Sequence, residues 1–195
     1  MGLWDASMTR VGFLLALAFT AMAGSASAAV SVMGTGYAKA CFEAAENARS
    51  LRDALRICDS ALLDDGAAAV DRAATLVNRG IVQMQAQNYL AAIADYDAAI
   101  KLEPDTAEAY VNKGIALMRL GNDDEAVAQL SEGIARNPKR PEIAFYNRAV
   151  AHEGLGKARE AYEDYSRAAQ LAPEWAEPAE QLQRFQLVRR KTAAG

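Results

Sequence analysis

Few residues of this sequence have the chemistry that catalysis or metal binding requires. His152 is the only histidine in the 195-residue chain, and it lies among small and apolar residues. The sequence has no phosphate-binding glycine loop, no nucleophile elbow and no cluster of metal-ligand residues. Its carboxylates are scattered along helical patterns, which is typical of a solvated acidic surface. We therefore expect no enzymatic activity, no cofactor and no metal, and we expect a structural role for His152.

The two cysteines, Cys41 and Cys58, are 17 residues apart, which is too far for one face of a single helix. If residues 37–47 and 51–63 form antiparallel helices that turn at 49–50, the two thiols lie opposite each other. A disulfide that closes a loop of this length contributes roughly 3 kcal/mol in the chain-entropy model. The alternative is a pair of buried free thiols that act as small apolar side chains. The spacing favours neither a zinc site nor a Cys-x-x-Cys redox pair.

Three asparagines, Asn78, Asn112 and Asn147, recur at almost equal spacing within predicted helices. Asparagine is a mediocre helix residue because its amide competes for backbone hydrogen bonds. The amide is both a donor and an acceptor, so a row of amides suits the backbone of an extended peptide. The row is therefore a candidate peptide-binding ladder. The alternative is simple duplication, with each amide serving contacts between neighbouring repeats.

The chain repeats itself between residues 73 and 175 with a period of 34 or 35, which is typical of a helical repeat array. Each copy has a small, a small, a bulky, a small and a proline residue in the same order. These are Gly80, Ala92, Tyr96, Ala99 and Pro104; Gly114, Ala126, Leu130, Gly133 and Pro138; and Ala149, Ala161, Tyr165, Ala168 and Pro173. Glycine inside a helix costs about 1 kcal/mol relative to alanine. Gly80 and Gly114 therefore indicate close contact between paired helices, with Gly80 against Ala92 and Ala99.

The central copy shows where its two helices begin and end. Residues 106–120 are predicted as the first helix, which Asp105 and Glu108 would open as a capping box. Asn122 and Glu125 repeat that pattern before a second helix over residues 122–136, and Pro138 prevents its continuation. Both helices are apolar on more than one face, so successive hairpins must stack on one another.

This pattern resembles the tetratricopeptide repeat family, which implies an all-α fold, a right-handed solenoid of antiparallel helical hairpins with a C-terminal capping helix. The small–bulky–proline pattern is specific for the fold, whereas the family's scaffold serves many partners. The chain is divided as follows: 1–28 signal peptide, 29–34 linker, 35–72 degenerate repeat with the cysteine pair, 73–106, 107–140 and 141–175 repeats, and 176–195 capping helix and basic tail.

In this family the first helix of each hairpin lines a concave groove, so the resemblance implies which residues face a partner. Beside the asparagine row lie three apolar rows: Val77, Val111 and Tyr146; Ile81, Ile115 and Val150; and Met84 and Met118. If exposed, they form the kind of apolar patch that marks an interaction surface. The alternative is that they belong to the core. The positions of the family's carboxylate clamp hold Ala74, Glu108, Val77 and Val111, so binding of chaperone C-terminal tails is not expected.

Basic residues accompany the asparagines, at Arg79, Lys113 and Arg148. Asp95 and Asp164 follow Arg79 and Arg148 by sixteen residues, on the antiparallel second helices. We therefore predict ion pairs within these two repeats rather than a basic groove. Such pairs contribute about 0 to 1 kcal/mol when they are exposed.

The amino end is predicted to direct the chain out of the cytoplasm. Residues 11–23 form an apolar run that follows Arg10, and Ala26-Ser27-Ala28 provides small residues for cleavage. A run of this length is short for a membrane span, which needs about 20 apolar residues. A periplasmic or secreted location is oxidising, and this favours the disulfide over free thiols. Met8 is an alternative start.

Composition excludes one further class of function. The net charge is −4 and the pI is about 5.1, without the basic face that nucleic acid requires. Arg189, Arg190 and Lys191 end a predicted helix, where they stabilise its dipole. The sequence thus predicts an exported, non-enzymatic adaptor that holds a peptide or helix of a partner protein in its groove. The alternative is self-association, as a homodimer through the groove or the last hairpin.

Overall fold

The structure, a computed structural model, describes residues 36–47 and 50–193, with side chains as far as Phe185. These residues contain nine helices and no strand. The helices are α1 (Tyr37–Asn47), α2 (Leu51–Leu62), α3 (Ala69–Gln85), α4 (Tyr89–Leu102), α5 (Ala107–Arg119), α6 (Asp123–Ala135), α7 (Pro141–Gly154), α8 (Ala158–Leu171) and α9 (Ala176–Ala193). The predicted signal peptide and linker, residues 1–34, lie outside the described residues.

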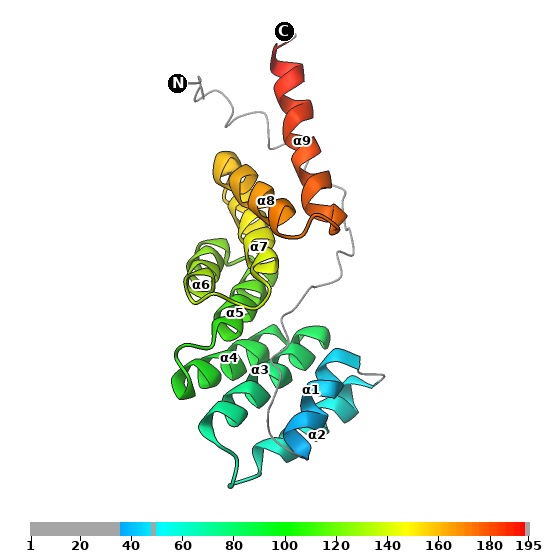
Figure 1. The fold of residues 1–195 in the computed structure, drawn as a ribbon, viewed down its shortest axis with the longest axis vertical. Coiled ribbons are helices and arrows are strands. Elements are labelled where there is room, and N and C mark those ends of the chain that lie inside the picture. Colours follow the sequence, from blue (N-terminus) through cyan, green and yellow to red (C-terminus); the bar gives the residue numbers. More distant parts are fainter. Residues whose placement is uncertain (1–35, 48–49, 194–195) are drawn as a thin grey trace.

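Four antiparallel hairpins stack one after another into an elongated solenoid, with α9 at its far end (Figure 1). The pairs are α1–α2, α3–α4, α5–α6 and α7–α8, and each also packs on the next pair. The cores of neighbouring hairpins are continuous. Met84 and Ile93 pack against a first cluster of buried side chains, which includes Val77 and Ile81, and also against a second cluster, which includes Val111 and Ile115. The all-α solenoid that the repeat predicts is confirmed.

At two helical glycines, the paired helix of the hairpin leaves no room for a side chain. A Cβ on Gly114 would lie 2.6 Å from Leu130 Cγ and 3.1 Å from the carbonyl oxygen of Ala126. A Cβ on Gly80 would overlap the ring of Tyr96. The predicted close contact is therefore present, and the atoms nearest to the added Cβ belong to the Tyr96 ring. The small residue makes room for the bulky residue of its own repeat.

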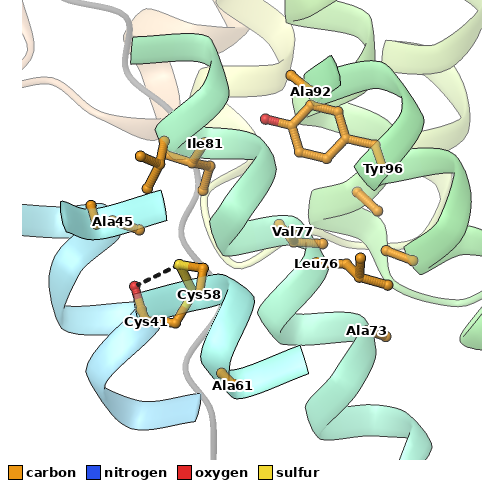
Figure 2. Close-up of a cluster of buried hydrophobic side chains, with 14 of the residues drawn as sticks. Cys41, Ala45, Cys58, Ala61, Ala73, Leu76, Val77, Ile81, Ala92 and Tyr96 are labelled. Carbon is orange, nitrogen blue, oxygen red and sulfur yellow. Dashed lines mark hydrogen bonds between the residues drawn. A yellow bond between two sulfur atoms is a disulfide. The ribbon is translucent and has the colours of Figure 1, made fainter. Parts of the chain in front are cut away.

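The predicted disulfide between Cys41 and Cys58 is present, and the structure describes no free cysteine. The Cα atoms are 4.6 Å apart, and both residues are completely buried. Figure 2 shows the bridge between α1 and α2, beside the part of α3 that carries Val77 and Ile81. It joins the two helices of the first hairpin at the surface that packs on the second.

The predicted ion pairs within the first and third repeats are confirmed. Arg79 donates to both carboxylate oxygens of Asp95, at 3.0 and 2.6 Å, and Arg148 donates to both oxygens of Asp164, at 2.7 and 2.8 Å. The two carboxylates are buried, so these are not the exposed pairs that the sequence predicted. Bidentate arginine–carboxylate pairs have a defined geometry and hold the two helices in register.

The three basic residues beside the asparagine row also contact the preceding hairpin, which the sequence did not predict. Arg79 Nη1 lies 2.8 Å from Asp59, Lys113 Nζ lies 2.6 Å from Asp97, and Arg148 Nη1 donates to Ser131 Oγ at 3.0 Å. Arg79 and Arg148 therefore each join the second helices of two successive hairpins, and Lys113 joins α5 to α4. This row of basic side chains therefore connects each hairpin to the one before it.

The capping boxes predicted for the central repeat are wrong. α5 and α6 begin after Thr106 and Asn122, and neither side chain makes a capping hydrogen bond. Glu108 is buried and accepts a hydrogen bond from the backbone N–H of Lys139 at 3.2 Å. Lys139 lies in the connection where the third repeat has one extra residue. Because Glu108 holds this connection, it does not serve the start of its own helix.

Two tyrosines at equivalent positions differ in how their hydroxyls are satisfied. Tyr165 donates to Glu153 at 2.6 Å, whereas the buried hydroxyl of Tyr96 has no hydrogen-bond partner among the described residues. Met84 occupies in its repeat the position that Glu153 occupies in the third. An unsatisfied buried hydroxyl costs about 1–3 kcal/mol.

Replacing these tyrosines by phenylalanine is therefore expected to have opposite effects. Tyr96→Phe removes an unsatisfied group and should raise the free energy of unfolding by about 1 kcal/mol. Tyr165→Phe removes a hydrogen bond to a carboxylate and should lower it by about 1.5 kcal/mol. Urea denaturation of the two variants measures the difference, and equal effects would contradict this assignment of hydrogen bonds.

Candidate functional site

The residues predicted to face the groove lie on the first helices of three hairpins, α3, α5 and α7. Val77, Asn78, Ile81 and Met84 follow one another along α3. The corresponding residues occupy the same registers on α5, and on α7 as far as Val150. The structure therefore places all eleven predicted groove residues on the equivalent helices. Their accessibility divides them into two groups.

The apolar rows on α3 and α5 are closed to solvent. Val77 and Val111 are 0 % exposed, and Ile81 and Ile115 are 1 % and 2 % exposed. Each belongs to a cluster of buried apolar side chains. The prediction of an exposed apolar stripe is wrong at these four positions, and the alternative that they belong to the core holds. The period shows which residues are equivalent, but it does not show how closely the neighbouring segments approach them.

The asparagine row is buried as well. Asn78, Asn112 and Asn147 are 0 %, 1 % and 9 % exposed. The amide of Asn147 donates to the carbonyl oxygen of Ile143, one turn earlier, at 2.8 Å. Asn78 and Asn112 also interact with other groups. The amides therefore do not lie open on the surface, and their role in binding a peptide stays a prediction.

Four of the predicted residues are half-buried and thus keep part of their surface accessible: Met84, Met118, Tyr146 and Val150. Met118 packs against the second buried cluster while part of it remains exposed. Tyr146 and Val150 pack against a third cluster of buried side chains, formed by Ala149 of α7 and by Ala161 and Tyr165 of α8. We call these four residues the accessible row. Methionine side chains adapt to partners of different shape, and aromatic and β-branched residues add apolar area.

An aromatic cluster closes the C-terminal end of the accessible row. The Tyr146 ring lies 4.8 Å from that of Trp175 and 5.4 Å from that of Tyr165, and Phe185 of α9 lies 6.1 Å from Tyr165. Burial raises the pKa of Tyr146, with a further contribution from Glu177. The Tyr146 hydroxyl therefore keeps its proton at neutral pH. The cluster supports α9 against the last hairpin.

A polar contact attaches α9 to the same place. Glu153 of α7 accepts hydrogen bonds from Tyr165 at 2.6 Å and from Arg184 of α9 at 3.2 Å. Burial and the neighbouring Glu153 carboxylate raise the pKa of Tyr165 well above its usual value, so its hydroxyl keeps its proton and donates. Sequence reasoning did not identify Glu153. The signal that could have found it is a carboxylate twelve residues before a core tyrosine.

His152 lies beside the ion pair between Arg148 and Asp164. Its Nε2 is 3.8 Å from Asp164, and its buried Nδ1 has no hydrogen-bond partner among the described residues. Burial lowers the pKa of His152, and the charge of Arg148 contributes, whereas Asp164 opposes the shift. In the part of the chain that the structure describes, no three histidine, cysteine, aspartate or glutamate side chains are placed to hold a metal ion.

The lowered pKa predicts how stability depends on pH. The unfolded chain takes up a proton at His152 near its ordinary pKa of about 6.5, before the folded protein does. The stability contributed by neutral His152 is therefore present above this pH and is lost as the pH falls below it. We expect a lower Tm at about pH 5.5 than at about pH 7.5, and a smaller difference in His152→Gln. Burial raises the pKa values of Asp95 and Asp123. These two carboxyl groups therefore make the folded protein more stable as the pH falls, mainly at lower pH than His152. An equal pH dependence in His152→Gln would contradict this assignment to His152.

Comparison with known proteins agrees with this geometry. Two family models, both described as tetratricopeptide repeat, match residues 77–141 and 143–174. Residues 77–141 and 143–174 are tetratricopeptide repeats. A solved structure titled MamA 41-end from Desulfovibrio magneticus RS-1 has a TM-score of 0.64 at 24 % identity, covering 82 % of this chain and 90 % of that one. The tetratricopeptide solenoid is therefore the fold of this chain.

Other similar proteins carry tetratricopeptide domains in different settings. The first TPR of Spaghetti (RPAP3), solved bound to HSP90 peptide SRMEEVD, has a TM-score of 0.59 at 24 % identity and covers 62 % of this chain and 95 % of that chain. A DnaJ homolog subfamily C member 7 homolog of Schizosaccharomyces pombe is 30 % identical over 119 residues, 59 % of this chain and 25 % of the relative. Human serine/threonine-protein phosphatase 5 is 30 % identical over 105 residues, 54 % of this chain and 21 % of the relative. The chain thus spans a quarter or less of the length of these last two relatives.

Tetratricopeptide domains mediate protein–protein interactions, and the fold is generally a non-catalytic interaction module. Among the described residues, none of the helices is both long and apolar enough to cross a membrane.

Proposed function

We propose that this protein is an exported, non-enzymatic adaptor that binds a peptide or a helix of a partner protein along α3, α5 and α7. The observation that carries the proposal is the accessible row: four apolar residues at groove positions keep exposed surface, although the rows beside them are buried. Exposed apolar patches mark interaction surfaces on proteins, and we propose that the accessible row is part of such a surface. The domain class supports the same function.

Export is the second part of the proposal. It is supported by the signal-peptide pattern of residues 1–28 and by the disulfide between Cys41 and Cys58, since such bonds persist in oxidising compartments. We propose a periplasmic or secreted location. Fractionation of the producing cells, with amino-terminal sequencing of the mature protein, tests this. Recovery in the cytoplasm with an intact amino terminus would contradict it.

The partner is best sought by photo-crosslinking from the accessible row. A photoreactive amino acid at Val150 or Met118 should crosslink a protein partner in an extract of the compartment that holds the protein. The matched control is the same group at Leu90, which is 74 % exposed on α4. A partner captured equally from all three positions would not be bound in the groove. A crosslink to a second copy of the chain from Val150 alone would favour self-association through the last hairpin.

A further inference from the structure

The two ends of the solenoid have complementary properties that the proposed function does not use. The connection between α2 and α3 lies at one end of the elongated molecule, and α9 lies at the opposite end (Figure 1). The first end exposes apolar and acidic residues, and the second ends in a basic segment.

The amino-terminal end exposes large apolar side chains on an ordered connection. Leu63 is 80 % exposed and Val70 is 60 % exposed, which are among the highest values for large apolar residues in the described chain. Arg72 holds the connection by donating to the carbonyl oxygens of Leu62 at 2.9 Å and Asp64 at 3.0 Å. Leu63 is thus presented to solvent by a hydrogen-bonded connection.

The same connection is acidic. Asp64 and Asp65 are both exposed, and neither forms an ion pair with a described residue. Asp64 accepts a hydrogen bond from the backbone N–H of Gly66 at 3.0 Å, which shapes the turn. We call Leu63, Asp64, Asp65 and Val70 the head surface. It combines two exposed apolar side chains with two negative charges.

The carboxyl-terminal end consists of the second half of α9. Among the side chains that the structure describes, Leu182, Arg184 and Phe185 attach the first half of α9 to the last hairpin. Beyond them the helix continues past α8 as far as Ala193 (Figure 1). Its sequence there is Leu187-Val188-Arg189-Arg190-Lys191. We call residues 187–191 the tail segment.

We propose that the head surface of one copy binds the tail segment of a second copy, so that the protein associates head to tail. Opposite charges guide the encounter and fix its orientation, and the exposed leucine and valine side chains supply apolar area. The occupant is a second copy because charge and apolar character are complementary between the two ends of this chain. The contact joins two different surfaces, so it is heterologous and continues into open chains rather than closing at a dimer. Because few residues take part, association is weak and depends on concentration.

Sedimentation velocity of the purified protein over a hundredfold range of concentration tests this directly. We expect one copy at low concentration and a continuous rise in mean mass at high concentration. In 0.5 M NaCl, where charges are strongly screened, the dissociation constant should rise at least about tenfold. A protein that stays as one copy at all concentrations, or that stops at a dimer, would overturn the proposal.

Variants test the surfaces. Leu63→Glu should weaken association at least about tenfold, whereas Leu90→Glu, an equally exposed leucine on α4, should leave it unchanged. Equal effects of the two substitutions would overturn the assignment to the head surface. Circular dichroism checks that both variants remain helical.

A charge exchange gives the sharpest control. One variant carries Asp64→Lys and Asp65→Lys, and a second carries Arg189→Glu, Arg190→Glu and Lys191→Glu. Each variant alone should stay as one copy, because its two ends have the same sign. An equimolar mixture should associate again, and a mixture that does not would overturn the proposal. Loss of binding to anionic vesicles in the second variant, with no association of the unchanged protein, would instead assign the basic segment to a membrane.

Discussion

Replacing Gly114 with valine is expected to lower the free energy of unfolding by about 3 kcal/mol. The new Cβ would lie 2.6 Å from Leu130 Cγ and 3.1 Å from the carbonyl oxygen of Ala126. Leu130 is completely buried, and the carbonyl belongs to the backbone of α6, so neither can move without disturbing the hairpin. Valine also loses side-chain freedom in a helix, although glycine itself is a poorer helix former. Gly114→Ala should lie between valine and the unchanged protein.

Gly154 provides the matched control for this substitution. A Cβ at Gly154 would meet Asp123 Oδ2, the end of a half-exposed side chain that can rotate into solvent. Gly154→Val should therefore cost less than about 1 kcal/mol. Chemical denaturation of both variants checks the difference. If Gly114→Val is as stable as Gly154→Val, the small residues of the repeat are not there to allow close helix contact.

Removing the disulfide should have an effect of similar size that is confined to one end of the solenoid. Replacing Cys41 and Cys58 by alanine removes a cross-link worth roughly 3 kcal/mol for a loop of this length. Repeat arrays lose stability locally, because each hairpin contacts only its neighbours. The first hairpin has a neighbour on one side only among the described residues. It should therefore open before the rest.

Native-state hydrogen exchange distinguishes this local effect from a general loss of stability. Amide protons of α1 and α2 should exchange at least about a hundredfold faster in the double alanine variant, which corresponds to the cross-link energy. Amide protons of α7 and α8 should change little. Uniformly faster exchange along the chain would contradict a local role, and unchanged exchange in α1 would contradict any stabilising role.

The repeat was sufficient to predict the fold and several of its contacts. The periodic set of small, bulky and proline residues implied stacked hairpins, because such hairpins cannot bury their apolar faces alone. The sixteen-residue step from Arg79 to Asp95 was sufficient for a contact between antiparallel helices, and the structure contains it. The cysteine pair could be assigned since its spacing suited one hairpin.

The candidate site could be predicted only in part, because periodicity identifies equivalent residues and not their surroundings. Val77 and Val111 occupy groove positions but are completely buried, whereas the equivalent Tyr146 is not. The burial of a side chain depends on contacts with segments distant in sequence. Glu108 illustrates the same limit: its spacing indicated a helix cap, yet it accepts its hydrogen bond from Lys139, 31 residues later.

Titration of the crosslinked partner's binding segment against Met118→Glu tests the proposed function most directly. Met118 belongs to the accessible row, so a charge there should weaken binding at least about tenfold, which corresponds to about 1.4 kcal/mol. Leu90→Glu, on α4 and outside that row, should bind like the unchanged protein once circular dichroism shows that both variants are folded. Equal affinity of the three proteins would contradict binding along α3, α5 and α7.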